Sequence, residues 1–176
     1  MKGTALLVID VQQGLLDERP YNADALLKDI RTLQDHARQN GTEVIFVRHN
    51  EDDRNGLFLG SPAWEIGAAI APLADETIIE KRFSSAFKDT ELEACLRERN
   101  VQTLVICGMQ TEYCVDATVK SAFERGYKVF VPKHGTTTFD ASIAPAATLR
   151  AFYEDDIWDG RFADVVSLDE ALQKLG

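Results

Sequence analysis

Residues 103–108 read Thr-Leu-Val-Ile-Cys-Gly, an apolar run without polar alternation that stops at a glycine. Such a run is typical of a strand covered on both faces, as strands are in a parallel sheet with helices on each side. The stretch therefore predicts an interior strand over residues 103–107. The other short runs of this kind, each predicted as a strand, are residues 5–9, 43–47, 77–79, 128–131 and 164–166.

Longer amphipathic segments alternate with the predicted strands. The clearest follows Asn22, a residue type that caps helices, and stops at Gly41. The predicted helices are residues 22–40, 91–99, a segment from close to 114 to 126, residues 143–153 and residues 168–175. This repeated strand–helix order predicts a three-layer α/β/α (Rossmann-like) fold with a mostly parallel sheet of about six strands. Because the 176 residues contain no linker, repeat or low-complexity tract, we expect a single domain over residues 1–176.

The composition narrows the possible partners. Acidic residues outnumber basic ones by 29 to 19, which gives a net charge of −10 and argues against nucleic acid or an anionic membrane as a partner. The apolar run at residues 5–9 is too short for a signal sequence or a membrane span, so we expect a cytoplasmic protein. The three cysteines show no Cys-x-x-Cys spacing, which disfavours a disulfide framework or a zinc site.

Three reactive side chains follow predicted strands. Asp10 follows the first strand, Lys81 the third, and Cys114 lies just past the fourth at a predicted helix start. Ligands of open parallel sheets bind beyond the carboxyl ends of the strands, so these groups are expected to converge. A helix N-terminus and a nearby ammonium both lower the pKa of a thiol, and Asp10 could accept its proton. The interpretation is a nucleophilic Cys114, with a backbone N–H at the helix start to stabilise an oxyanion.

Each of these residues alone has an ordinary alternative. An aspartate after a strand is often a helix cap or loop acid, lysines are mostly solvated, and an isolated cysteine is usually an inert buried residue. Cys95 and Cys107 fit that last description.

The neighbours of these residues resemble a known family. Residues 108–115, Gly-Met-Gln-Thr-Glu-Tyr-Cys-Val, resemble the G-x-x-T-x-x-C-V signature of isochorismatase-like cysteine hydrolases. Asp10-Val11-Gln12 resembles the D-x-Q of that family, and residues 81–87, Lys-Arg-Phe-Ser-Ser-Ala-Phe, resemble its K-x-x-x-S-A-F segment. The three matches occur in the family order. The relatives include nicotinamidases, N-carbamoylsarcosine amidohydrolases and streptothricin hydrolases.

The resemblance implies a mechanism and an assembly. It implies a triad of Asp10, Lys81 and Cys114 that hydrolyses the C–N bond of a small-molecule amide or ureido compound through a thioester. It also implies a non-proline cis peptide between Met109 and Gln110, with the backbone N–H groups of Gln110 and Cys114 forming the oxyanion hole. Members of the family are dimers or tetramers, so a homodimer or homotetramer is expected.

The sequence departs from some relatives. Nicotinamidases of the family hold a divalent metal with a D-x-H motif and further histidines after the second strand. Residues 48–53 here read Arg-His-Asn-Glu-Asp-Asp, in which only His49 offers an imidazole. A carboxylate site from Glu51, Asp52 and Asp53 stays open beside a solvated acidic loop, and we expect neither a metal nor another cofactor.

Two further features bear on the substrate. True isochorismatases act on an enol ether and often lack the cysteine, so Cys114 favours an amide or ureido substrate. His134 stands where many relatives have an aspartate after the fifth strand, so that edge of the pocket departs from the family pattern.

Four other residues are candidates for substrate contact. Residues 49–63 form a long irregular stretch, and loops of that length are often functional. Aromatic side chains in and near it would suit a planar amide, although loop packing or helix capping is an equal alternative. Gln12 could orient the substrate or Asp10, or simply make a structural hydrogen bond. The candidates are Gln12, Trp64, Phe87 and Tyr113.

Two functions of other classes compete with a hydrolase. The first is a non-catalytic or redox-responsive scaffold that keeps the fold, although a scaffold has no need of an acid, a lysine and a thiol together. The second is a nucleotide-binding domain, which is disfavoured because no glycine-rich phosphate loop follows Asp10.

Overall fold

The structure, a computed structural model, describes residues 3–51 and 56–176 of the chain. The strands are β1 (Thr4–Ile9), β2 (Glu43–His49), β3 (Thr77–Lys81), β4 (Thr103–Met109), β5 (Lys128–Pro132), β6 (Thr136–Thr137) and β7 (Asp164–Val166). The α-helices are α1 (Gln13–Asp17), α2 (Ala23–Gln39), α3 (Leu92–Glu98), α4 (Asp116–Glu124), α5 (Ala146–Phe152) and α6 (Leu168–Leu175). A 3₁₀ turn, η1 (Ala68–Ile70), and two π-helical turns, η2 (Thr111–Val115) and η3 (Tyr153–Trp158), complete the elements.

The sheet is parallel, as the apolar runs predict. Within the described residues it has seven strands in the order β3-β2-β1-β4-β5-β7, and β6 pairs with the end of β4. The six predicted strands are present. The two-residue strand β6 was not predicted, because two threonines do not form a recognisable strand pattern. The strands β2, β3 and β4 each run two residues further than predicted, to His49, Lys81 and Met109. Because of these extensions, His49, Lys81 and Met109 are the last residues of their strands and lie at the carboxyl edge of the sheet.

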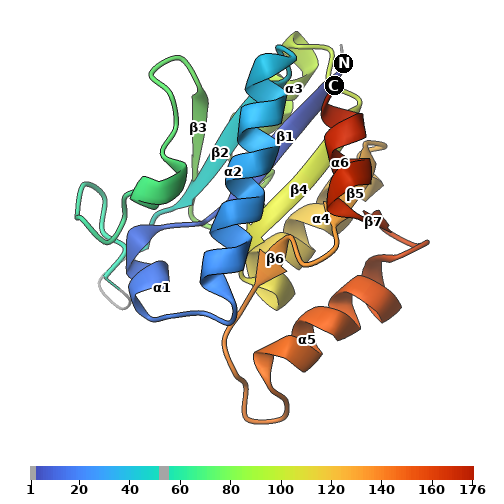
Figure 1. Cartoon of the computed structure of the whole chain (residues 1–176). Helices are drawn as coiled ribbons and strands as arrows, with labels where there is room; N and C mark the ends of the chain where they lie inside the picture. Colours follow the sequence, from blue (N-terminus) through green and yellow to red (C-terminus); the bar gives the residue numbers. More distant parts are fainter. Residues whose placement is uncertain (1–2, 52–55) are drawn as a thin grey trace.

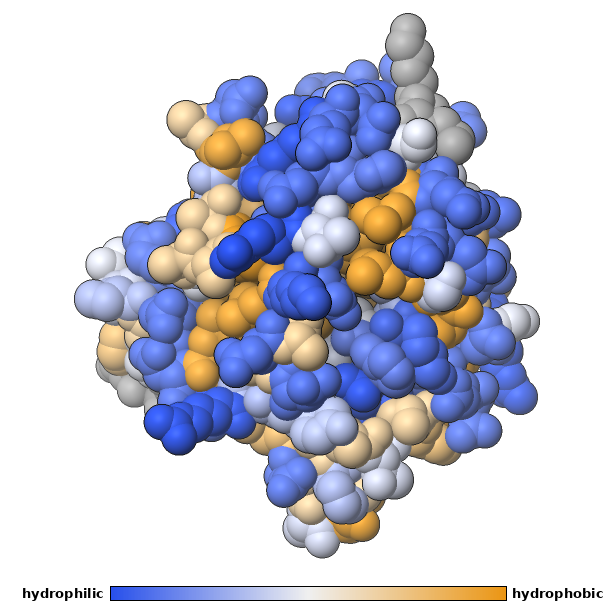
Figure 2. Space-filling model, viewed as in Figure 1, coloured by the Kyte–Doolittle hydropathy of each residue, from blue (hydrophilic) through white to orange (hydrophobic). Residues whose placement is uncertain are grey.

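Helices cover both faces of the sheet, which confirms the three-layer architecture. On β1, Leu6 and Val8 point to one face and Leu7 and Ile9 to the other. The first face packs against α2 and α6, and the second against α3 and α4. In Figure 1, α2 and α6 lie in front of the sheet and α4 behind it. The outer surface of the front layer is largely hydrophilic in Figure 2, as expected of amphipathic helices.

Several helices differ from their predicted bounds. The segment expected to begin as a helix close to Cys114 instead starts as the π-helical turn η2, and the regular helix α4 begins at Asp116. The helix expected from residue 143 begins at Ala146, because Pro145 fits the position before the first turn. Neither α1 nor η1 was expected, since both are too short to give a periodic pattern.

Gly108 lets the ends of β1 and β4 lie side by side. It pairs with Ile9 in the parallel register and has a φ of +128°, a conformation that favours glycine. A Cβ added there would lie 2.1 Å from the backbone oxygen of Ile9. Its N–H donates to the carbonyl of Gly135 at 3.0 Å, which ties the turn before β6 to the same point. Any side chain at this position would push the two central strands apart just below the site.

No helix among the described residues is long and apolar enough to cross a membrane.

We expect Gly108→Ala to lower the free energy of unfolding by more than about 3 kcal/mol, because the new methyl overlaps fixed backbone in a strained conformation. Urea unfolding followed by circular dichroism measures this. Gly126→Ala is the matched control, since Gly126 also has a positive φ (+86°) but nothing within 4 Å of an added Cβ, so only about 1–2 kcal/mol should be lost. Equal losses in the two variants would show that the contact with Ile9 does not matter.

Candidate active site

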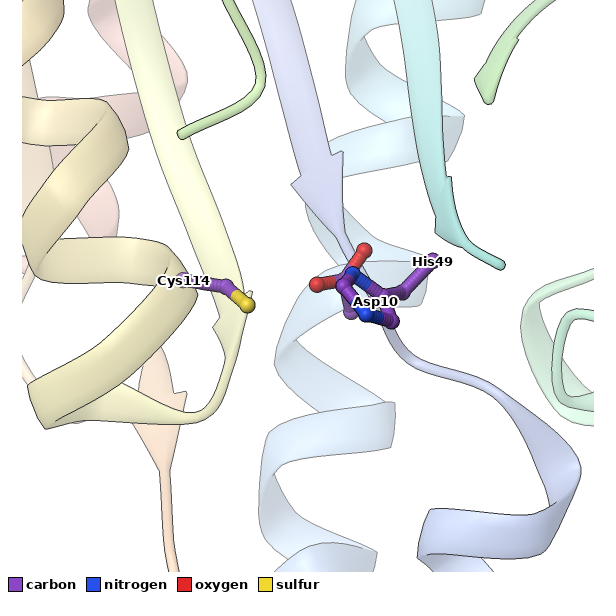
Figure 3. Close-up of side chains that lie close together, drawn as sticks. All are labelled: Asp10, His49 and Cys114. Carbon is purple, nitrogen blue, oxygen red and sulfur yellow. The ribbon is translucent and has the colours of Figure 1, made fainter. Parts of the chain in front are cut away.

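The structure brings together Asp10, Lys81 and Cys114 at the carboxyl edge of the sheet. Lys81 Nζ lies 2.6 Å from Asp10 Oδ2 and 3.2 Å from Cys114 Sγ. In Figure 3, the Cys114 side chain points from its helical turn toward Asp10, which follows the end of β1. The three residues come from separate segments, and the parallel sheet order places those segments next to one another.

Lys81 is a long side chain folded inward from the outermost strand, β3. Lys81 pairs with His49 in the parallel register of β3 and β2. Its side chain therefore reaches past the end of β2 to contact Asp10. It is only 2% exposed. Burial disfavours the ammonium, but the charge of Asp10 and the hydrogen bonds to Asp10 and Cys114 outweigh that effect and raise the pKa of Lys81 above its ordinary value. Lys81 is therefore a buried cation rather than the solvated lysine that is common on surfaces.

Asp10 lies in a tight turn that directs its carboxylate into the site. Its φ is +50°, a left-handed conformation that aspartate tolerates better than most residues. The Asp10 N–H still donates to Val47 at the end of β2, and its carbonyl accepts from the Gln12 N–H. The carboxylate is thus held where the chain turns away from the sheet.

Cys114 is fixed through its own backbone. The Cys114 carbonyl accepts a hydrogen bond from the Thr118 hydroxyl at 2.7 Å, and the Thr118 oxygen accepts from the Ala86 N–H at 3.0 Å. Ala86 belongs to the segment that follows Lys81, so this bridge joins the cysteine turn to the lysine segment. The peptide between Met109 and Gln110 is cis, as the resemblance implied.

The resting thiol is protonated. Burial and the nearby Asp10 carboxylate raise the pKa of Cys114 to about 12, although Lys81 acts in the opposite direction. The expectation of a lowered thiol pKa is therefore wrong, because the side chain is more buried than a helix start suggests and faces an anion as well as a cation. A nucleophile in this environment needs a base that accepts its proton during attack.

His49, at the end of β2, has a larger part in the site than its sequence context suggested. Its Nδ1 lies 2.9 Å from Lys81 Nζ. Asp10, His49 and Cys114 each offer one metal-ligand atom, and these atoms lie within 4.8 Å of one another. The Lys81 ammonium contacts all three residues, so an ion bound by the same atoms would have to displace it. The absence of a metal stays a prediction.

A cavity of about 610 Å³ opens over these residues. The cavity is lined by acidic, basic and apolar side chains. Such a lining would suit a small molecule with an uncharged planar part. Sequence reasoning missed the contributions of α1 and of the chain after β6, because neither element was expected. The lining residues are Asp10, Leu15, Glu18, His49, Glu51, Leu57, Arg82, Phe83, Ser84, Met109, Gln110, Tyr113, Cys114 and Phe139.

Of the four candidates for substrate contact, Tyr113 lines the cavity. It is 59% exposed at the mouth, beside Cys114. Gln12 lies outside the lining and is fully buried. Its Nε2 donates to the carbonyls of His49 (3.0 Å) and Trp64 (2.9 Å), and its Oε1 accepts from the His49 N–H (2.9 Å). Gln12 therefore makes structural hydrogen bonds, which was the alternative to a role in orienting the substrate or Asp10.

The other two aromatic candidates are also buried outside the lining. Trp64 packs under the guanidinium of Arg48, whose Cζ lies 3.2 Å from the ring centroid, and its indole N–H donates to Asn50. Phe87 packs in the core, with its ring centroid 5.8 Å from that of Tyr127. Packing of loop on core is therefore the role that the structure gives both side chains.

Two other features raised by the sequence lie at the margins of the site. Of the acidic loop, Glu51 lines the cavity, while Asp52 and Asp53 lie outside the described residues. His134 sits in the turn before β6 with a φ of +65° and is not a lining residue. Its N–H donates to the buried carboxylate of Glu154 at 2.8 Å.

Comparison with known proteins agrees with this geometry. Residues 4–170 match the family model of the isochorismatase domain. An uncharacterised isochorismatase family protein of Bacillus subtilis is 35% identical over 152 residues, which cover 81% of this chain and 84% of that protein. A streptothricin hydrolase of Streptomyces noursei is 32% identical over 143 residues, which cover 80% of this chain but only 57% of the longer relative.

More distant relatives carry the names of amidases. A nicotinamidase 3 of Arabidopsis thaliana is 28% identical, covering 99% of this chain and 89% of that protein. An N-carbamoylsarcosine amidase of Arthrobacter is 29% identical, covering 86% of this chain and 62% of that protein.

The fold comparison points the same way. The crystal structure of a putative isochorismatase hydrolase from Oleispira antarctica superposes with a TM-score of 0.92 at 28% identity, covering 98% of this chain and 97% of that one. The chain belongs to the isochorismatase family.

Proposed function

We propose that this protein is a hydrolase acting on carbon–nitrogen bonds other than peptide bonds, with a small-molecule amide or ureido compound as substrate. The observation that carries the proposal is the position of the Lys81 ammonium, in contact with both the Asp10 carboxylate and the Cys114 sulfur. The amidase and hydrolase names of the relatives support the choice of bond.

In the first step, Cys114 attacks the carbonyl carbon of the substrate while Asp10 accepts the thiol proton. Because the thiol is protonated at rest, the proton leaves as the carbon–sulfur bond forms. The ammonium of Lys81 stabilises the negative charge that develops on the sulfur. The carbonyl oxygen becomes an oxyanion, to which the backbone N–H groups of Gln110 and Cys114 would donate.

In the second step, the tetrahedral intermediate collapses. The carbon–nitrogen bond breaks, the proton held by Asp10 passes to the leaving nitrogen, and a thioester on Cys114 remains. Water then attacks the thioester, with Asp10 accepting the proton of the water and returning it to the sulfur. The product carboxylic or carbamic acid leaves and the site returns to its starting protonation.

The resemblance to the family also supports a homodimer or a homotetramer. Analytical ultracentrifugation of the purified protein measures this directly, and a monomer at micromolar concentration would contradict it.

Replacing the nucleophile should abolish hydrolysis without unfolding the protein. We expect Cys114→Ala and Cys114→Ser to lower kcat/KM by about 10³-fold or more. The measurement is release of ammonia or amine from nicotinamide, N-carbamoyl amino acids, biuret-type ureides and lactam amides. Cys95→Ala is the matched control, because Cys95 lies on α3 outside the cavity and should keep full activity. Wild-type protein that turns over none of these compounds, and never forms a thioester detectable by intact mass, would favour the scaffold alternative.

Alkylation of Cys114 by iodoacetamide should report its protonation state. With a thiol pKa of about 12, the rate in the folded protein should rise up to pH 10 without a plateau and stay below that of the unfolded chain. Asp10→Asn should speed alkylation, since the carboxylate raises the thiol pKa, and Lys81→Met should slow it. Asp10→Asn should nevertheless lose hydrolysis, because it removes the base. A plateau below pH 8 in the wild type would contradict a protonated resting thiol.

A further inference from the structure

The Lys81 ammonium has a third partner besides Asp10 and Cys114. An ammonium carries three N–H donors and no acceptor. The atoms that face it are Asp10 Oδ2 at 2.6 Å, His49 Nδ1 at 2.9 Å and Cys114 Sγ at 3.2 Å. Because Lys81 can only donate, Nδ1 of His49 must accept through its lone pair. His49 is then a neutral imidazole that carries its proton on Nε2.

We infer that His49 is a positioning residue, whose neutral imidazole accepts one N–H of Lys81 and so directs the other two at Asp10 and Cys114. This inference rests on the proposed function, since it assigns a further residue to the same reaction. His49 acts through Lys81 and not on the substrate.

The orientation of His49 is built into the fold. The parallel register pairs His49 with Lys81, so both side chains leave the sheet at the same level. The Gln12 side chain bonds the backbone of His49 on both sides, accepting from its N–H and donating to its carbonyl. Nε2 of His49 lies 3.5 Å from a carboxylate oxygen of Glu51, which favours a proton on that nitrogen. Gln12 therefore holds the backbone of His49, and Glu51 holds the imidazole ring at Nε2.

A neutral acceptor suits this position better than a third charged group. Burial and the Lys81 charge lower the pKa of His49, while Asp10 and Glu51 act in the opposite direction. A carboxylate in the place of His49 would offset the charge that Lys81 offers to the sulfur. A protonated His49 would instead turn an N–H toward the ammonium and break the contact.

The charged and titratable groups around His49 come from four segments. They are Lys81 of β3, Asp10 after β1, Cys114 of η2, and Glu51 two residues beyond His49 itself. Because protonation of His49 would break its contact with Lys81, it should cost activity at acid pH.

The tautomer of His49 can be tested without any substrate. The chain has three histidines, so ¹⁵N-histidine spectra of wild type and His49→Asn identify the His49 signals. We expect an unprotonated Nδ1 and a protonated Nε2 at pH 7, and loss of this preference in Lys81→Met. A proton on Nδ1, or a spectrum unchanged in Lys81→Met, would overturn the inference. This arm stays informative even if no substrate is found.

A matched pair of variants tests the effect on catalysis. Asparagine and leucine branch alike at Cγ, but only asparagine offers an oxygen near the place of Nδ1. His49→Asn should keep most of the wild-type kcat, whereas His49→Leu should lose about 10- to 100-fold in kcat with little change in KM, as expected for loss of a hydrogen bond to a charged group. Equal loss in the two variants, or equal retention, would overturn the inference.

The pH profile separates positioning from a merely structural role. At the acid end, protonation of His49 should break its contact with Lys81, so kcat/KM should fall more steeply with decreasing pH in the wild type than in His49→Asn. Equal slopes would overturn the inference, and urea unfolding of both variants checks that the fold is intact. Activity that survives in Cys114→Ala would sink the proposed function instead, so the two failures are distinguishable.

Discussion

The buried contact between the Lys81 ammonium and the Asp10 carboxylate is the interaction on which the rest of the site depends. Removing two charges from water is costly, and the pair is tolerated only because each charge meets its partner at short range. The fold supplies that proximity through strand order, since the long lysine side chain reaches from the edge strand past β2 to the end of β1. A shift of one residue in the register of β3 would turn Lys81 to the other face of the sheet.

The same electrostatic arrangement defines what the thiol can do. Cys114 faces an anion and a cation at once, and burial adds to the effect of the anion, so the proton stays on sulfur until a substrate arrives. Such a site differs from one that stores a thiolate, because its reactivity depends on transfer of the proton to a neighbouring base. A resting thiol of this kind is also protected from stray oxidation, which attacks the ionised form.

Much of the fold could be predicted from the sequence, because buried parallel strands are continuous apolar runs such as residues 103–107. The convergence of Asp10, Lys81 and Cys114 followed from the positions of strand ends. The pairing of His49 with Lys81 could not, because it depends on how β2 and β3 align, which no local pattern encodes. The pKa of Cys114 was predicted in the wrong direction, since it depends on burial. Trp64 follows the long irregular stretch and Phe87 ends the K-x-x-x-S-A-F segment, but packing, which sequence spacing does not report, buried both rings outside the cavity lining.

The Gln12 amide has a consequence for how such a site can change over time. The Gln12 side chain bonds only to backbone atoms, those of His49 and Trp64, and the cavity-lining residues Glu51 and Leu57 lie between these two positions in the sequence. Backbone atoms persist whatever side chains lie between those positions. The cavity wall can therefore acquire new side chains, and with them new substrates, while the geometry around the sulfur is inherited unaltered.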